Sequence, residues 1–277
     1  MSLILKKEPN LATKYQAFQY QREAVEAICD REYGAFFHEQ GLGKTKIAID
    51  LLLYWQEKKQ VDKVMLVVKK GLIANWAREI QTHSYLSPRF LTADRRNNFY
   101  VLNSPTRLIL THYEAVKGER KRLLLFLKTR SVGAILDEAT KIKNPGSDIA
   151  QAFFELAPLF KKRVIMTGTP VANRPYDLWA QIKFLDQGKA LGTDFESFKK
   201  ELDLSNDLSV NEEAQRTFET ALRGLNDKLA GFTVRETKNS GVIQLPAKVV
   251  KTITTDWEAR QLDLYTQVKD NLRAVVV

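Results

Sequence analysis

A glycine-rich turn ending in lysine and threonine is the segment best suited to chemistry. His38-Glu-Gln-Gly-Leu-Gly-Lys-Thr45 separates a short apolar run at 34–37 from a segment with helical periodicity at 44–59. Backbone N–H groups of such a turn face phosphate oxygens, and the following helix adds its partial positive charge. We expect Lys44 to reach the β and γ phosphates of ATP and the Thr45 hydroxyl to hold Mg²⁺. The predicted nucleotide-binding residues of this loop are Gln40, Gly41, Leu42, Gly43, Lys44 and Thr45. The alternative is a chance glycine-rich turn before an amphipathic helix.

Two adjacent carboxylates close another apolar run. Val132-Gly-Ala-Ile-Leu136 leads directly into Asp137 and Glu138. Carboxylates at a buried strand end are costly unless a cation or hydrogen bonds compensate them. In a phosphate-loop ATPase the aspartate holds Mg²⁺ and the glutamate polarises the attacking water. We therefore expect Lys44, Asp137 and Glu138 to be catalytic. Alternatively, Asp137 caps a helix and Glu138 lies in its first turn.

The elements that must position these groups alternate between strand and helix. Ligands of parallel sheets bind beyond the carboxyl ends of the strands, where these motifs fall. Apolar strands bracketed by helices predict an α/β fold with three layers, a parallel central sheet and helices on both faces. Strands are expected at 34–37, 63–68, 107–110, 132–136 and 163–166, and helices at 44–59 and 72–82.

The pattern changes after about Asp186. Residues 195–230 look helical and charged, and Pro246 indicates a boundary. A strand at 249–254 and a helix at 257–275 are expected to follow. The chain then ends on apolar residues, which suggests a longer parent protein, with a short buried tail as the alternative. We predict an ATP-binding lobe at 1–185, a helical insertion at 186–245, and a linker towards a second lobe at 246–277.

Composition restricts the class of protein. The chain has 277 residues, 44% hydrophobic and 27% charged, which is typical of a globular protein. A formal charge of +10 favours a polyanionic partner such as nucleic acid, although a basic surface without that role is the alternative. Cys29 is the only cysteine, and no apolar run is long enough to span a membrane. We expect a soluble, intracellular protein without a membrane partner.

The motifs together resemble the first motor lobe of superfamily-two helicases, specifically Swi/Snf-type double-stranded DNA translocases. The segments that carry this likeness occur in the family's order and cover nearly the whole chain: Phe18–Gln21, Gln40–Thr45, Val67–Trp76, Leu108–Glu114, Asp137–Asn144, Met166–Pro170 with Asn173 to Trp179, Arg235–Lys238 and Leu245–Lys248.

The resemblance implies a RecA-like lobe, with a helical C-terminal extension, that uses ATP and Mg²⁺. It implies that Gln21 contacts the adenine. It also implies binding to double-stranded DNA through the phosphate backbone, hence without sequence preference. The implied DNA contacts are Lys69, Lys70 and Thr111, although simple solvation is the alternative for the two lysines. The residues implied to couple nucleotide state to DNA are Thr167, Gly168 and Thr169. If the source is bacterial or viral, the expected compartment is the cytoplasm or nucleoid.

Several positions depart from the family's pattern. His38 stands where the loop usually has glycine or aspartate, Lys69 replaces a proline, and Thr140 replaces a histidine. The second lobe, with its arginine fingers, has no counterpart in this sequence. Such an arginine raises the rate of ATP hydrolysis about 10³–10⁵-fold. We therefore expect weak ATP binding and little hydrolysis from this chain alone. A strand-separating DNA or RNA helicase and a non-hydrolysing binding module stay open as alternatives.

Other prominent residues have simpler interpretations. Trp76 and Trp179 are expected to be packing residues, since aromatic side chains in helices usually lie in the core. The basic segment 117–130 is expected to form a charged outer helix face. Lys161-Lys-Arg163 is expected to be solvated.

Overall fold

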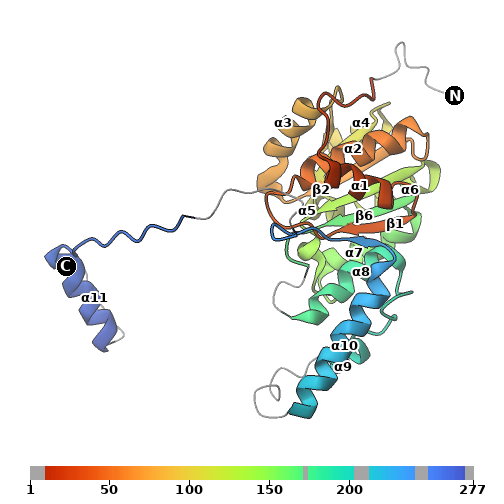
Figure 1. The fold of residues 1–277 in the computed structure, drawn as a ribbon. Helices are drawn as coiled ribbons and strands as arrows, with labels where there is room; N and C mark the ends of the chain where they lie inside the picture. The colour runs from red at the N-terminus through yellow and green to blue at the C-terminus, as the bar shows by residue number, and fades with distance from the viewer. Residues whose placement is uncertain (1–9, 171–173, 203–211, 241–248, 272–277) are drawn as a thin grey trace. The chain divides into compact units, whose positions relative to one another are not determined.

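Parallel strands form a single sheet in the order β3-β4-β2-β5-β6-β1-β7 (Figure 1). The computed structural model describes residues 10–170, 174–202, 212–240 and 249–271. The strands are β1 (Tyr33–Phe36), β2 (Lys63–Val68), β3 (Arg89–Leu91), β4 (Leu108–His112), β5 (Val132–Asp137), β6 (Lys162–Met166) and β7 (Thr233–Val234).

Both faces of the sheet are buried, as the apolar runs predict. In β2, Val64, Leu66 and Val68 join one hydrophobic core, whereas Met65 and Val67 join the other. Successive side chains of a strand point to opposite faces, so a continuous apolar run fills two cores. The predicted α/β class with a parallel central sheet is therefore confirmed.

Helices cover the two faces in two separate sets. One core is completed by α1 (Gln19–Ile28), α2 (Lys44–Glu57) and α3 (Ile73–His83). The helices that contribute to the other core are α4 (Arg95–Asn103), α5 (Tyr113–Gly118), α6 (Arg120–Thr129), α7 (Asp148–Leu156), α8 (Trp179–Asp186), α9 (Phe195–Leu202) and α10 (Glu212–Ala230). Short 3-10 turns are η1 (Lys70–Leu72), η2 (Ala139–Ile142), η3 (Ala157–Leu159) and η4 (Pro175–Leu178).

The carboxyl ends of four strands lie level with one another. Asp137 pairs in register with Met166, Met166 with Phe36, and Phe36 with Val234. The loops that follow β5, β6, β1 and β7 therefore leave the sheet side by side. This row is what brings the predicted motifs together.

The chain returns to the sheet after its helical part. Helices α9 and α10 lie within the predicted helical range 195–230, and β7 then pairs with β1. The sheet thus continues inside the range 186–245. The chain groups into two compact units, 1–242 and 243–277. The predicted functional boundaries at 185/186 and 245/246 stay predictions.

The expected strand at 249–254 is wrong. Residues 249–258 have no regular structure, and Val249, Val250 and Ile253 are exposed. A strand needs a partner for its backbone groups, and β-propensity alone does not supply one. The last helix is α11 (Ala259–Asn271), shorter than the predicted 257–275, and 272–277 lie outside the described residues.

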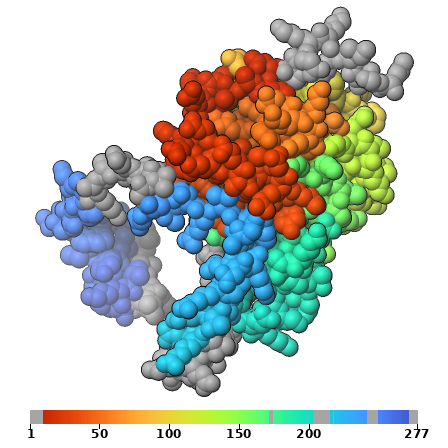
Figure 2. Space-filling model, turned by 45° about the vertical axis from the view of Figure 1, so that its right-hand side comes forward, coloured from red at the N-terminus to blue at the C-terminus, as the bar shows by residue number. Residues whose placement is uncertain are grey.

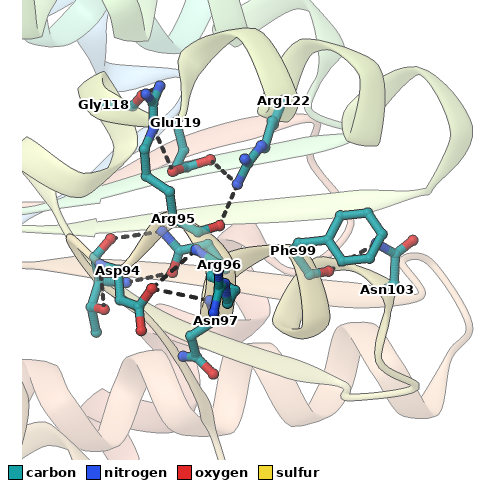
Figure 3. A network of polar contacts seen from close by, with 11 residues as sticks. Asp94, Arg95, Arg96, Asn97, Phe99, Asn103, Gly118, Glu119 and Arg122 are labelled. Atoms are coloured by element: carbon teal, nitrogen blue, oxygen red, sulfur yellow. Dashed lines mark hydrogen bonds and ion pairs between the residues drawn. The ribbon is translucent and has the colours of Figure 1, made fainter.

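The buried carboxylate of Glu119 links helix α4 to helix α6 (Figure 3). Glu119 lies between Arg95, at 3.6 Å, and Arg122, at 3.2 Å. The Asp94 side chain caps α4 by accepting from the backbone N–H groups of Arg96 and Asn97. These contacts join the start of α4 to the start of α6.

The basic cluster expected to be solvated is in fact partly buried, which corrects that expectation. Lys161 is exposed, but the Lys162 ammonium donates to the Cys29 carbonyl at 2.9 Å. Arg163 is 1% exposed. Its guanidinium donates to the carbonyls of Leu185, Ala157 and Phe160 and pairs with Glu32. Five fixed N–H donors allow arginine to satisfy several carbonyls at once, which explains a cation at a buried strand start.

Arg163→Met should destabilise the fold by about 3 kcal/mol, because three buried carbonyls lose their donor. The midpoint of urea unfolding measures this. Lys161→Met, two residues away and exposed, is the matched control and should change stability by less than about 0.5 kcal/mol. Equal midpoints for the two variants would contradict the structural role of Arg163.

Candidate functional site

The glycine-rich loop begins after β1 and ends at the first residue of α2. Gly41 and Gly43 have φ of 84° and 69°, and Gly43 is the N-cap of α2. A Cβ on Gly43 would lie 2.2 Å from the Gln21 side-chain nitrogen. The left-handed backbone favours glycine there, and any larger residue would also displace the end of the Gln21 side chain. The loop geometry is thus the one expected of a phosphate cradle at a helix N-terminus.

Lys44 is folded back onto this loop. Its Nζ donates to the carbonyls of His38, at 2.9 Å, and Glu39, at 3.3 Å. Burial lowers the pKa of Lys44, and the charges of Glu138 and Asp137 act in the opposite direction. Since the hydrogen-bond partners are neutral carbonyls, the ammonium can exchange them for an anionic phosphate oxygen.

Asp137 is held in a defined orientation at the end of β5. Its Oδ2 accepts a hydrogen bond from the Trp76 indole at 2.8 Å, and its carbonyl accepts one from the Tyr113 hydroxyl at 2.7 Å. Burial raises the pKa of Asp137, while the Trp76 hydrogen bond lowers it. Because burial disfavours the charged form of the Asp137 carboxylate, a cation bound beside it would stabilise that form.

Trp76 is therefore more than the packing residue that the sequence suggests. It is 2% exposed, so it does pack, but it also orients the carboxylate. The available signal was its indole N–H, because a buried tryptophan usually finds an acceptor. Trp179 agrees with the packing interpretation: it is buried and its ring packs against Phe154 and Phe195.

Glu138 adopts a left-handed backbone conformation, with φ of 52° and ψ of 56°. For a residue other than glycine this costs about 1 kcal/mol or more, and such strain is found at functional sites. Glu138 precedes η2 without a side-chain capping hydrogen bond. Asp137 uses its carboxylate to accept from Trp76. The helix-capping alternative for this pair is therefore wrong.

The turn after β6 lies directly against the glycine-rich loop. A Cβ on Gly168 would be 3.3 Å from Lys44 Nζ and 3.1 Å from Gln40 Cγ. Thr167 is fully buried, and its hydroxyl accepts from the Thr169 N–H at 3.1 Å. The structure thus brings the predicted coupling residues to the loop. Hydrogen bonds from their hydroxyls to the Asp137–Asn144 segment stay a prediction.

Gln21 lies under the loop. It is 4% exposed, its Oε1 accepts from the Phe18 N–H at 3.0 Å, and its Nε2 is 3.5 Å from the Leu42 carbonyl. The side chain therefore supports the loop backbone, a role the sequence did not suggest. Its expected contact with the adenine stays a prediction.

The predicted DNA-contacting residues do not share one environment. Lys69 is half-buried and Lys70 is exposed, both directly after β2 at the same edge of the sheet as the loop. Thr111, by contrast, is fully buried, and its hydroxyl donates to the Leu91 carbonyl at 2.9 Å. This corrects the expectation for Thr111, because a hydroxyl that joins β4 to β3 is not available to a phosphate.

His38 is the unusual residue of the loop. It is 1% exposed, its Nδ1 has no hydrogen-bond partner in the described part of the chain, and its ring lies 6.0 Å from that of Phe36 and 6.4 Å from that of Tyr20. Burial lowers its pKa to about 4, and Lys44 acts in the same direction. At this position of the loop, a neutral imidazole therefore replaces the glycine or aspartate that is usual in the family's pattern.

Trp76→Phe should raise the pKa of Asp137, because the hydrogen bond that favours the charged carboxylate is lost. A carbon-13 NMR titration of the Asp137 carboxyl measures this. Trp179→Phe removes another buried indole and should leave the titration unchanged. An unaltered Asp137 titration in Trp76→Phe would show that the hydrogen bond does not tune this carboxylate.

Acid should destabilise the fold through His38. The unfolded imidazole titrates near 6.5 and the folded one at about 4, so stability is complete above pH 6.5 and falls as pH drops towards 4. Between pH 7 and pH 5 the expected loss is about 2 kcal/mol. In urea unfolding at both pH values, His38→Asn should lose about that much less than the unmutated chain. The same pH dependence in both proteins would rule out this assignment.

Comparison with known proteins agrees with the geometry. The chain is 26% identical over 268 residues to the uncharacterized ATP-dependent helicase MG018 of Mycoplasma genitalium, covering 93% of this chain and 24% of that protein. It is 27% identical to the nuclear protein STH1/NPS1 of Saccharomyces cerevisiae, covering 95% and 20%.

Among solved structures, the Sulfolobus solfataricus SWI2/SNF2 ATPase core in complex with dsDNA shares the fold, with a TM-score of 0.68 at 24% identity, covering 87% of this chain and 48% of that one. The chain thus spans less than a quarter of these curated relatives and about half of the solved core. Residues 20–276 match the SNF2-related domain family, and the chain belongs to that family.

Proposed function

We propose that the chain is the ATP-binding lobe of a DNA-dependent ATPase that translocates on double-stranded DNA. The observation that carries this proposal is the meeting of Lys44, Gly168 and the Asp137–Glu138 pair at one edge of the sheet. A Cβ added to Gly168 would lie 3.3 Å from Lys44 Nζ, and the charges of Glu138 and Asp137 raise the pKa of Lys44 against the effect of burial. Relatives named as ATP-dependent helicases and chromatin-remodelling ATPases support the same activity.

Each group has a defined task in this proposal. The N–H groups of the loop and Lys44 bind the phosphates of ATP. The Thr45 hydroxyl, in the first turn of α2, and the Asp137 carboxylate hold Mg²⁺. Glu138 accepts a proton from the attacking water as general base. Trp76 keeps Asp137 oriented by its 2.8 Å hydrogen bond.

Duplex DNA is the proposed partner of the same edge. Exposed Lys70, its neighbour Lys69, and the formal charge of +10 provide positive charge for backbone phosphates. Phosphate contacts carry no base information, so binding would be independent of sequence. The solved core that shares this fold was captured with dsDNA, which supports the choice of duplex over single strands.

A second RecA-like lobe would complete the motor by supplying arginine to the phosphates. The two lobes would then move relative to each other, because their contacts in the cleft differ between the ATP-bound state and the product state.

In the described residues, none of the helices has the length and apolar character needed to cross a membrane.

Calorimetric titration of Mg²⁺–ATP into this chain tests the ATP site. We expect weak but measurable binding that Lys44→Ala abolishes, because the loop then loses its phosphate-binding cation. Lys121→Ala, an exposed lysine of α6, is the charge-matched control and should bind normally. ATP turnover should stay near background with duplex DNA added, since an arginine finger is worth about 10³–10⁵ in rate. Unchanged affinity in Lys44→Ala, or strong DNA-stimulated turnover by this chain, would contradict the proposal.

A further inference from the structure

The segment after β7 lies along the glycine-rich loop. The Val234 carbonyl accepts from the Phe37 N–H at 2.8 Å, and the Glu236 carbonyl accepts from the Glu39 N–H at 2.9 Å. Parallel pairing of β7 with β1 therefore continues past the sheet into the loop. In Figure 2 the light-blue chain after α10 lies against the red N-terminal part of the molecule, as this pairing requires.

This segment places the Lys238 side chain beside Gly41. The backbone N–H of Lys238 donates to Glu39 Oε2 at 2.8 Å, and its ammonium lies 3.8 Å from Glu39 Oε1. A Cβ on Gly41 would meet Lys238 Cε at 3.7 Å and Nζ at 3.9 Å. The ammonium thus lies beside Gly41 of the loop, on a side chain long enough to reach a group bound there.

The ion pair that holds this ammonium is easily exchanged. The two side chains are 41% and 43% exposed, and the 3.8 Å separation is long for a charge-assisted hydrogen bond. Pairs of this kind contribute little to stability. A polyphosphate carries several negative charges on freely accessible oxygens, so it is a stronger partner for the lysine than Glu39.

We propose that Lys238 is a second phosphate-binding cation of the site. Its ammonium rests on Glu39 when the loop is empty and moves to a phosphate oxygen when a nucleotide binds. Glu39 then acts as a competitor that holds the lysine close to the loop. This inference rests on the proposed ATP site and assigns to it a residue almost 200 positions from the loop, beyond the helical part of the chain.

Competition of ATP and of adenosine against a fluorescent ATP analogue tests this role. Lys238→Ala should weaken ATP binding about tenfold and leave adenosine unchanged, because only the phosphates are affected. Lys238→Arg should retain most of the affinity, and Lys121→Ala should match the unmutated chain. Glu39→Gln should strengthen ATP binding by releasing the lysine, and the gain should shrink when Lys238→Ala is also present. Unfolding midpoints check that each variant is folded.

Four results would overturn the proposal. An equal loss for ATP and adenosine in Lys238→Ala, or weaker ATP binding in Glu39→Gln, would mean that the pair only shapes the loop. Lys44→Ala separates this failure from that of the ATP site itself. If ATP binding needs Lys44 but does not change in Lys238→Ala, the ATP site stands and the role of Lys238 is refuted. If the unmutated chain does not bind ATP, the ATP site and the role of Lys238 are both refuted.

Discussion

Parallel pairing in register places Asp137, Met166, Phe36 and Val234 in one row across four strands. Each of these residues is at the end of its strand, so the four loops that follow start from neighbouring points. Those loops contain Glu138, Thr167–Thr169, the glycine-rich turn, and the Glu236–Lys238 segment. A one-residue slip of any strand would turn its buried side chains to the opposite face. The two hydrophobic cores therefore fix the register, and the register fixes the site.

Charge is distributed across this row in a way that suits an anionic ligand with a cation. Lys44 rests on neutral carbonyls, Lys238 rests on an exposed carboxylate, and Asp137 is buried and oriented by Trp76. The two lysines can readily exchange their partners for a ligand. The Trp76 indole, by contrast, holds the Asp137 carboxylate in place. His38 stays neutral because burial lowers its pKa to about 4, so it adds no further positive charge to the loop near neutral pH.

Much of the site could be predicted from local sequence, because its residues are contiguous and carry their chemistry in their spacing. The strand–loop–helix around Lys44 and the strand ending in Asp137 are of this kind. Contacts between distant segments could not be predicted. Trp76 meets Asp137 across 61 positions, and Thr111 is buried by a strand, β3, whose three residues have no clear apolar pattern. The expected strand at 249–254 was wrong for the opposite reason, since its local preference was not matched by a pairing partner.

We infer that the ends of β1, β5 and β6 form one nucleotide site. Hydrogen–deuterium exchange with and without Mg²⁺–ATP tests it most directly, since it reports each loop separately. The structure predicts that residues 38–45, 137–140 and 167–169 gain protection together when nucleotide is added, and that Lys44→Ala removes the gain from all three. Protection confined to one of these segments, or appearing elsewhere in the chain, would show that they do not form one nucleotide site.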